Sequence, residues 1–315
     1  MITENNEGSS MNNQSWKPMR HEEVNPEIMN VLEVFVEDLP QLPVHVYKLL
    51  KIMSQSEINS KEVAKVASSD PGMVSKILKA VNSSYYGLTK KTENLHLAIT
   101  ILGFNEVRNI AVQSGFTKIF GGGWIYRNYD TRDLWEHSYL VSVCAETLAK
   151  EINMQETGKL LTYGILHDIG KYALYKLIVL MKKKRVRPYK YKPFSTVSYL
   201  LDKEETLFGV NHTIVGNMLS QKWGFSENIC AILKYHHFPS FWSQDSIPPE
   251  YLKDVALISI SDMLINLISE NKNKIPEPSR EYFDLLGLSY PPENLITKKL
   301  EEKLEEAREF VHLIK

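Results

Sequence analysis

The sequence predicts an all-α protein in which both halves of the chain are helical. In the first half, apolar residues recur at spacings of three and four from Ile28 onward, shortly after Pro26, which suits the first turn of a helix. In the second half, His137, Val141 and Cys144 begin a stripe with the same spacing. Between such runs stand residues that cap or stop helices, so we expect short connections and no extensive sheet.

Six helices are expected in the first half. They should cover about residues 26–36, 46–53, 60–67, 71–81, 94–102 and 105–120. The proline-rich stretch 39–43 breaks the chain after the first helix. Asp70 is able to accept hydrogen bonds from free backbone amides, while Pro71 takes the first position of the fourth helix. Gly87 marks a stop after that helix.

Composition bounds the possible functions. The 315 residues are 43% hydrophobic and 24% charged, which is typical of a soluble globular protein with one large domain or two modest ones. The net charge of −1 disfavours a whole-protein attraction to nucleic acid or an anionic membrane. There is no run of about eighteen uncharged apolar residues and no signal-peptide layout, so we expect a cytoplasmic protein outside the membrane. Cys144 and Cys230 lack metal-type spacing and should be reduced core residues.

Three segments are expected along the chain. Residues 1–24 are rich in Asn, Ser and Glu and should form a disordered tail. Residues 25–123 should form a first helical lobe that ends in Gly121-Gly122-Gly123, a natural hinge. Residues 124–315 should form a second helical lobe, which carries the candidate chemistry.

The short helices of the first lobe are similar to a helix-turn-helix series, which raises the question of DNA binding. The candidate recognition helices carry Lys76 and Lys79, or Arg108 alone. Because no cluster of Arg, Lys, Asn or Gln lies on one face to contact base edges, the sequence disfavours DNA binding.

Polar residues on otherwise apolar helix faces mark the second half. His167 and Asp168 follow the apolar run 160–165, and as neighbours they should lie about 100° apart on one helix, both able to face inward. Inward placement is also expected for His137, His212, His236 and Asp262. Taken singly, such a histidine is more often a core residue that is hydrogen-bonded to a carbonyl.

A metal centre would account for the whole set. An isolated buried carboxylate is costly unless it is paired or coordinated. Five of the nine histidines fall between His137 and His237, which favours a cluster. Imidazole and carboxylate ligands suit Fe, Mn, Zn or Ni, and such sites with open positions activate water. We therefore expect one or two divalent transition-metal ions.

The order of these residues and the motifs around them resemble the pattern of a known superfamily. The order His137, then His167-Asp168 within Leu-His-Asp-Ile-Gly-Lys, then Asp262 within Ser-Asp-Met-Leu is similar to the HD superfamily of metal-dependent phosphohydrolases. His212 and the pair His236-His237 look like the extra ligands of its binuclear HD-GYP branch. The resemblance implies a metal-ligand set of His137, His167, Asp168, His212, His236, His237 and Asp262.

The first half closely resembles the HDOD family, the HD-related output domain of bacterial signalling proteins. The motifs that carry this resemblance lie at residues 39–43, 70–71, 79–87 and 98–103, and the similarity covers most of residues 38–240. It implies an all-α, two-lobed fold with the HD-like helical bundle as the second lobe. It also implies an output or interaction module in which the HD ligands are often lost, whereas this sequence keeps them.

The sequence departs from the HD-GYP pattern after the histidine pair, where Phe238-Pro239-Ser240 stands in place of Gly-Tyr-Pro. This departure puts cyclic di-GMP hydrolysis in doubt. If the site is catalytic, Asp168 would bridge two metal ions through its two oxygens, and Lys171 would meet a phosphate oxygen. The alternative for Lys171 is a surface lysine after a helix-ending Gly170.

Two further segments complete the second half. The basic residues 182–192, with Tyr189 and Tyr191 among them, should either capture an anionic ligand such as a nucleotide or RNA, or form a solvated loop. A charged helix at about 292–314 has one apolar side that includes Leu300, so it should dock on the second lobe.

Two functions of different class follow. The first is a cytoplasmic signal-transduction output module of the HDOD type, with a retained metal site and a signalling protein as its partner. The alternative is a metal-dependent phosphohydrolase that acts on a nucleotide or another phosphorylated ligand, with Asp168 and Lys171 as its catalytic residues.

Overall fold

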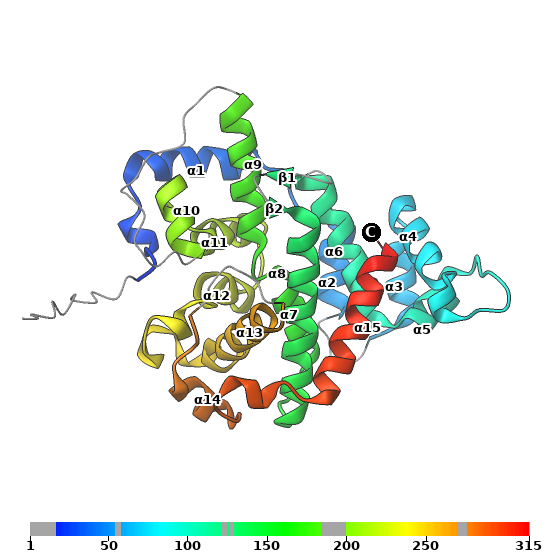
Figure 1. Cartoon of the computed structure of the whole chain (residues 1–315). Coiled ribbons are helices and arrows are strands. Elements are labelled where there is room, and N and C mark those ends of the chain that lie inside the picture. The colour runs from blue at the N-terminus through cyan, green and yellow to red at the C-terminus, as the bar shows by residue number, and fades with distance from the viewer. Residues whose placement is uncertain are drawn as a thin grey trace, which may run out of the picture.

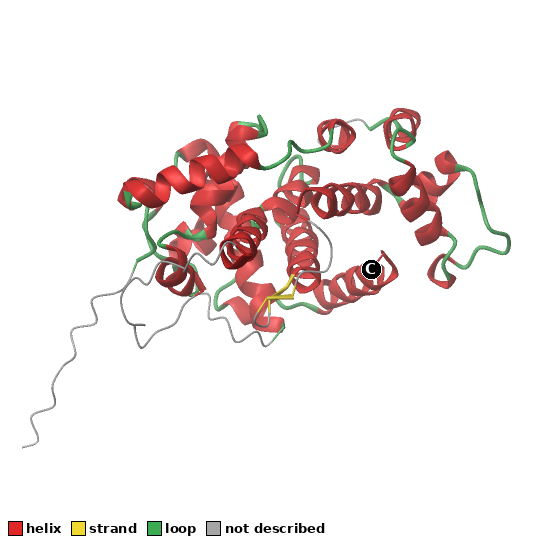
Figure 2. Ribbon diagram, turned by 90° about the horizontal axis from the view of Figure 1, so that it is seen from above, coloured by secondary structure: helices red, strands yellow, loops and turns green. Residues whose placement is uncertain are grey.

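The computed structural model describes residues 17–53, 58–120, 125–126, 129–183, 200–269 and 276–314. Within these ranges the protein is almost entirely helical, which confirms the all-α prediction (Figure 2). A short antiparallel pair of strands, β1 (Ile125–Tyr126) and β2 (Tyr129–Asp130), forms a two-stranded sheet. The glycine triplet 121–123 and the basic residues from 184 onward lie outside the described ranges.

The first half contains the six predicted helices. Their bounds are α1 (Pro26–Asp38), α2 (Val44–Met53), α3 (Ser60–Ala67), α4 (Pro71–Val81), α5 (Leu95–Leu102) and α6 (Phe104–Phe120). As predicted, the Asp70 carboxylate accepts a hydrogen bond from an amide in the first turn of α4, and Asn25, Asn59 and Asn94 cap other helices in the same way. Arg108 is only 1% exposed and so cannot reach a base edge.

The second half contains the remaining helices. Their bounds are α7 (Thr131–Glu151), α8 (Gly158–Leu166), α9 (Ile169–Lys183), α10 (Leu200–Phe208), α11 (His212–Lys222), α12 (Glu227–Tyr235), α13 (Pro249–Ile268), α14 (Arg280–Leu286) and α15 (Lys298–Ile314). Short 3-10 helices are η1 (His21–Glu23), η2 (Ser84–Tyr86), η3 (Phe238–Ser240), η4 (Gln244–Ser246) and η5 (Pro292–Leu295). Across the described ranges, no helix combines the length and apolar character that crossing a membrane would require.

The prediction of a single helix at about 292–314 is wrong at its start, where a short 3-10 helix precedes the α-helix. η5 and α15 are separated at Ile296, because the chain leaves the helical conformation there. α15 packs against α7 and also against α4, so it contacts helices from both halves of the chain (Figure 1).

The N-terminal segment also departs from prediction. Residues 1–16 lie outside the described ranges, but residues 17–24 are ordered rather than part of a flexible tail. The Met19 amide donates to the Glu205 carboxylate at 2.6 Å, and the Asn211 side chain donates to the Met19 carbonyl at 3.1 Å. These partners come from distant parts of the chain, so composition alone cannot reveal them.

Helix α1 belongs to the first half in sequence but lies against the second half in space. It packs on α11, and Figure 1 shows it on the same side of the molecule as α10 and α11, away from α3, α4 and α5. The Lys222 ammonium at the end of α11 donates to the Val36 carbonyl at 2.6 Å and to the Leu39 carbonyl at 2.8 Å. The division into lobes at residues 123 and 124 stays a prediction.

Candidate metal centre

Two glycines allow the helices that carry the candidate site to approach closely. A Cβ atom on Gly164 of α8 would lie 2.4 Å from the Cα atom of Ser142 on α7. A Cβ atom on Gly170 of α9 would lie 1.9 Å from the carbonyl oxygen of His212 on α11. Only a hydrogen atom fits at either position. Gly170 is the second residue of α9, so the alternative in which it ends a helix is wrong.

The sequence predicts that His167 and Asp168 lie on one helix, and this prediction is wrong. Helix α8 ends at Leu166 and α9 begins at Ile169, so the pair forms the junction between them. His167 keeps nearly helical angles, φ −50° and ψ −36°, which explains why the helical pattern of the sequence continues through the junction. Both side chains are buried, as predicted.

The seven predicted ligands lie together in two groups. Within each group the ligand atoms lie within 4.8 Å of one another, and the groups are His137, His167 and Asp262, and Asp168, His212, His236 and His237. All except His137 are buried. In the first group, His137 Nε2 lies 2.9 Å from Asp262 Oδ1.

The Asp168 carboxylate stands between the two groups. Its Oδ2 lies 3.3 Å from His167 Nε2, while its Oδ1 lies 3.2 Å from His212 Nε2. Burial alone would raise the pKa of this carboxyl, but the nearby His167 ring and Lys171 ammonium hold the pKa well below its ordinary value. Lys171 donates to Asp168 Oδ2 and is only 4% exposed, so the alternative of a surface lysine is wrong.

The outer nitrogens of the rings fix which nitrogens face the cluster. Nδ1 of His212 lies 2.7 Å from a Glu204 oxygen, and Nδ1 of His236 lies 3.0 Å from the Ile232 carbonyl oxygen. A carboxylate or carbonyl oxygen only accepts, so we assign the proton of each neutral ring to Nδ1. Nε2 of each ring then carries a lone pair that points into the cluster.

This arrangement fits a bound cation. Nε2 of His212 lies 3.2 Å from Nε2 of His236 and 3.2 Å from Nε2 of His237. The lone pairs assigned to Nε2 of His212 and His236 repel at such a distance unless a proton or a cation lies between them. Nitrogen ligands about 2.1 Å from one ion lie roughly 3.0 to 3.4 Å apart, which matches the observed separation. Among the described residues, no hydrogen-bond partner satisfies the buried atoms His167 Nε2 and Asp262 Oδ2.

Burial favours neutral rings at His236 and His237, whereas at His212 the effect of burial is outweighed by the nearby Glu204 carboxylate, which raises the pKa of that ring. Burial lowers the pKa of His236 to about 4, and it lowers the pKa of His237 well below the ordinary value. A neutral imidazole is the form that binds a metal ion. The donor set therefore suits a divalent transition metal better than it suits a cluster of protonated histidines.

Two supporting residues are absent from the sequence prediction. Glu204 of α10 is 4% exposed and also accepts from the His212 backbone amide at 2.9 Å. Asn266 of α13 donates to Asp262 Oδ1 at 2.9 Å, one helical turn away. The spacing of four residues was an available signal for Asn266, whereas nothing in the polar stretch around Glu204 distinguishes it from an exposed face.

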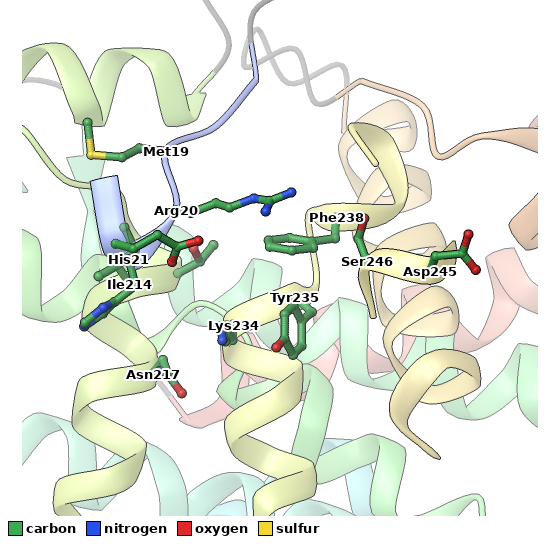
Figure 3. Close-up of a pocket in the computed structure, with 12 residues that line it drawn as sticks. Met19, Arg20, His21, Ile214, Asn217, Lys234, Tyr235, Phe238, Asp245 and Ser246 are labelled. Carbon is green, nitrogen blue, oxygen red and sulfur yellow. The ribbon is translucent and has the colours of Figure 1, made fainter. Parts of the chain in front are cut away.

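A cavity of about 400 Å³ lies beside this cluster, between the N-terminal segment, α11 and α12 (Figure 3). Arg20 extends across it toward Phe238, and Lys234 lines it from α12. Thr213, the residue after His212, also lines it, but none of the predicted ligands does. The cavity is therefore a neighbour of the metal-ligand cluster and not its opening.

The sequence matches the family model of the HDOD domain over residues 39–239. An uncharacterised protein of Treponema pallidum (strain Nichols) is 21% identical over 242 residues, which cover 74% of this chain and 43% of that protein. The uncharacterised protein YuxH of Bacillus subtilis (strain 168) is 39% identical over 62 residues, which cover 20% of this chain and 15% of YuxH. The chain thus spans less than half the length of these relatives.

Solved structures share the fold. A proposed signal transduction protein from Marinobacter aquaeolei VT8 has a TM-score of 0.70 at 16% identity, over 91% of this chain and 66% of that one. An HDOD domain protein of unknown function from Geobacter sulfurreducens has a TM-score of 0.59 at 19% identity, over 91% and 98%. A proposed metal-dependent phosphohydrolase from Shewanella amazonensis SB2B has a TM-score of 0.55 at 17% identity, over 90% and 98%.

Proposed function

The chain belongs to the HDOD domain family, and we propose that it is a signal-transduction output module whose buried cluster binds one or two divalent transition-metal ions. The observation that carries this proposal is the 3.2 Å approach of the His212 Nε2 atom to Nε2 of both His236 and His237. Core histidines that only bond carbonyls have no reason to converge in this way. The proposed ligands are His137, His167, Asp168, His212, His236, His237 and Asp262.

The proposed output is a contact with a signalling protein in the cytoplasm. The family to which the chain belongs supports this choice, as does the description of the Marinobacter protein with the same fold. In this function the metal ion stabilises the junction of α8 and α9 with α11 and α12, because its ligands come from all of these elements or their ends. The metal site then has a structural or sensing role.

A metal-dependent phosphohydrolase is the second candidate. The position of Asp168 favours it, because its two oxygens face different ligand groups. A bound divalent ion supplies Lewis acidity and brings the pKa of a bound water toward neutrality. Asp168 would hold the two groups together, and the Lys171 ammonium, which it fixes in place, would meet a phosphate oxygen of a nucleotide or other phosphoester.

One experiment separates the two functions. Protein purified without chelator is analysed for Fe, Mn, Zn and Ni, and is then screened for turnover of phosphoesters and nucleotides. The output module requires bound metal that is lost in Asp168→Asn, with no turnover. Metal-dependent turnover that disappears in Asp168→Asn would establish the phosphohydrolase instead. Wild-type protein without a transition metal would contradict both.

A further inference from the structure

The cavity of about 400 Å³ beside the metal-ligand cluster has no part in the proposed function. Its walls come from segments that are far apart in the sequence, namely residues 19–22, the first half of α11, and the end of α12 with η3 and η4. We propose that this cavity binds a nucleotide, whose base is recognised by Asn217 and whose phosphate meets Arg20 and Lys234. None of these three residues is a proposed metal ligand.

Asn217 has a buried side-chain amide without a partner. The residue is 9% exposed, and its side chain makes no hydrogen bond among the described residues. Other buried asparagines are satisfied, since Asn211 donates to Glu205 at 2.7 Å and Asn266 donates to Asp262 at 2.9 Å. The Asn217 side chain lines the cavity, and Figure 3 shows it on the side of α11 that faces α12.

The amide of Asn217 is selective for one kind of ligand group. It offers an N–H donor and a carbonyl acceptor side by side. The complementary partner is a planar group with an acceptor and a donor next to each other, as on the edge of a nucleobase. A phosphate or carboxylate alone would leave the amide carbonyl unmet, so a base is the group that uses both atoms.

Aromatic side chains form the wall beside this amide. Tyr235 and Phe238 both line the cavity, with ring centroids 4.9 Å apart and an angle of 79° between their planes. The Trp242 ring packs on Phe238 with a centroid distance of 4.2 Å. Bases stack on such rings, because every base has a flat apolar face.

Two cations in the lining are free of carboxylates. The Arg20 guanidinium lies 5.3 Å from the centroid of the Trp242 ring, and the Lys234 ammonium lies 4.8 Å from the centroid of the Tyr235 ring. Neither forms an ion pair within the part of the chain that the structure describes. Arg20 is also fixed in place, because the amide and the carbonyl of Met19 are both hydrogen-bonded, at 2.6 and 3.1 Å. Both charges are therefore available to a phosphate.

The lining also contains two carboxylates, those of Glu22 and Asp245, both at exposed positions. Figure 3 shows Asp245 on η4 pointing away from Arg20 and Lys234, so it does not offset their charges. Glu22 is next to Arg20 in the sequence segment that lines the cavity, and its charge opposes an anion. Glu22→Gln should therefore strengthen nucleotide binding.

The test uses the full chain purified without chelator and the monophosphates of adenosine, guanosine, cytidine and uridine. The controls are ribose phosphate, which lacks a base, and the four nucleosides, which lack a phosphate. Binding is measured by titration calorimetry at low ionic strength. We expect at least one nucleotide to bind, and ribose phosphate and the matching nucleoside to bind at least about tenfold more weakly.

Variants locate the binding site. Asn217→Ala should weaken nucleotide binding about tenfold and Arg20→Ala about fivefold, with the metal content of both unchanged. The matched control is Arg280→Ala, because Arg280 also lies over a ring, that of Tyr290 at 5.6 Å, but is not in the cavity lining. It should bind like the wild type.

Asn217→Ala is expected to fold with an unchanged or higher Tm, because it removes an amide that has no partner and places alanine within a helix. Loss of affinity in this variant therefore cannot be attributed to unfolding. The proposal is overturned if no nucleotide binds, if ribose phosphate or the nucleoside binds as tightly as the nucleotide, or if Asn217→Ala and Arg20→Ala bind like the wild type.

Discussion

The Glu204 carboxylate stands behind His212, on the side of the ring that faces away from the cluster, 2.7 Å from Nδ1. It fixes the proton on Nδ1 and so leaves Nε2 free for a metal ion. We expect Glu204→Gln to lower metal affinity about 10- to 100-fold, as measured by competition with a chromogenic chelator. The control is Glu205→Gln, because Glu205 bonds Met19 and not a ligand. Equal affinity of Glu204→Gln and wild type would contradict this role.

Sequence periodicity identifies the candidate metal ligands better than it identifies the residues that hydrogen-bond those ligands. His137 and Asp262 stand out because each interrupts an apolar helical face, so their inward position is predictable. Glu204 lies among Asp202, Lys203 and Glu205, a polar run that has the pattern of a solvated face. Its partners are the backbone amide and Nδ1 of His212 at the start of α11, and periodicity within α10 carries no signal of that contact.

Glu106 gives the protein a pH dependence apart from the metal-ligand cluster. Burial raises the pKa of its carboxyl from 4.5 to about 7. Between these values the folded protein keeps a proton that the unfolded chain has released, so the free energy of unfolding falls as pH rises through this window.

Glu106→Gln removes this titration. We expect the variant to be more stable than the wild type by about 1 to 3 kcal/mol near pH 8, and nearly equal to it near pH 5. Urea unfolding of both proteins across this range checks the expectation. Parallel stability curves, with a constant difference at every pH, would show that Glu106 does not titrate as stated.

At the scale of elements, the contact between α9 and α11 depends on Gly170. We expect Gly170→Ala to cost about 3 kcal/mol or more, because the added methyl group would meet the backbone of His212. It should also weaken metal binding, since α9 would move away from α11. Chemical unfolding and metal titration measure the two effects.

Gly158→Ala is the matched control for that variant. Gly158 begins α8, and nothing lies within 4 Å of a Cβ atom added there. Its stability should stay within about 1 kcal/mol of the wild type. A small effect of Gly170→Ala, similar to that of the control, would mean that the two helices do not approach as described.

A lysine holds α1 on α11. The Lys222 ammonium bonds the carbonyls of Val36, Glu37 and Leu39 at the end of α1, where the helix dipole favours a cation. Lys222→Met should cost about 2 kcal/mol in thermal or chemical unfolding. Lys150→Met, which removes a partly exposed ion pair with Glu146 on the surface of α7, should change stability by less than about 0.5 kcal/mol. Equal effects would contradict the assigned role of Lys222.

Helix starts were predictable to within a few residues because the capping chemistry is local. Asp70 and Pro71 define the start of α4 by their own hydrogen-bonding and dihedral preferences. The break between α8 and α9 has no such signal, because no proline interrupts the pattern and Gly170 lies beyond the break. The helix is interrupted at His167 and Asp168, which both belong to the metal-ligand cluster, so the break belongs to the site and not to local propensity.

At the scale of the whole molecule, the sequence predicts helices and their order but not how the two halves contact each other. The position of residues 17–24 beside α10 depends on the polar partners Glu205 and Asn211, and that of α1 on α11 involves Lys222. The resemblance to a two-lobed family does not reveal them either, because the family match begins at residue 39. Both segments lie next to the elements that carry His212.

The central claim is that the buried histidines and aspartates converge because they bind a metal ion. The most direct measurement is anomalous X-ray diffraction from crystals of the full chain purified without chelator. We expect an anomalous peak at bonding distance, about 2.1 Å, from Nε2 of His212, His236 and His237. Crystals grown with added Fe, Mn, Zn and Ni that give no anomalous peak among these three rings would contradict the claim.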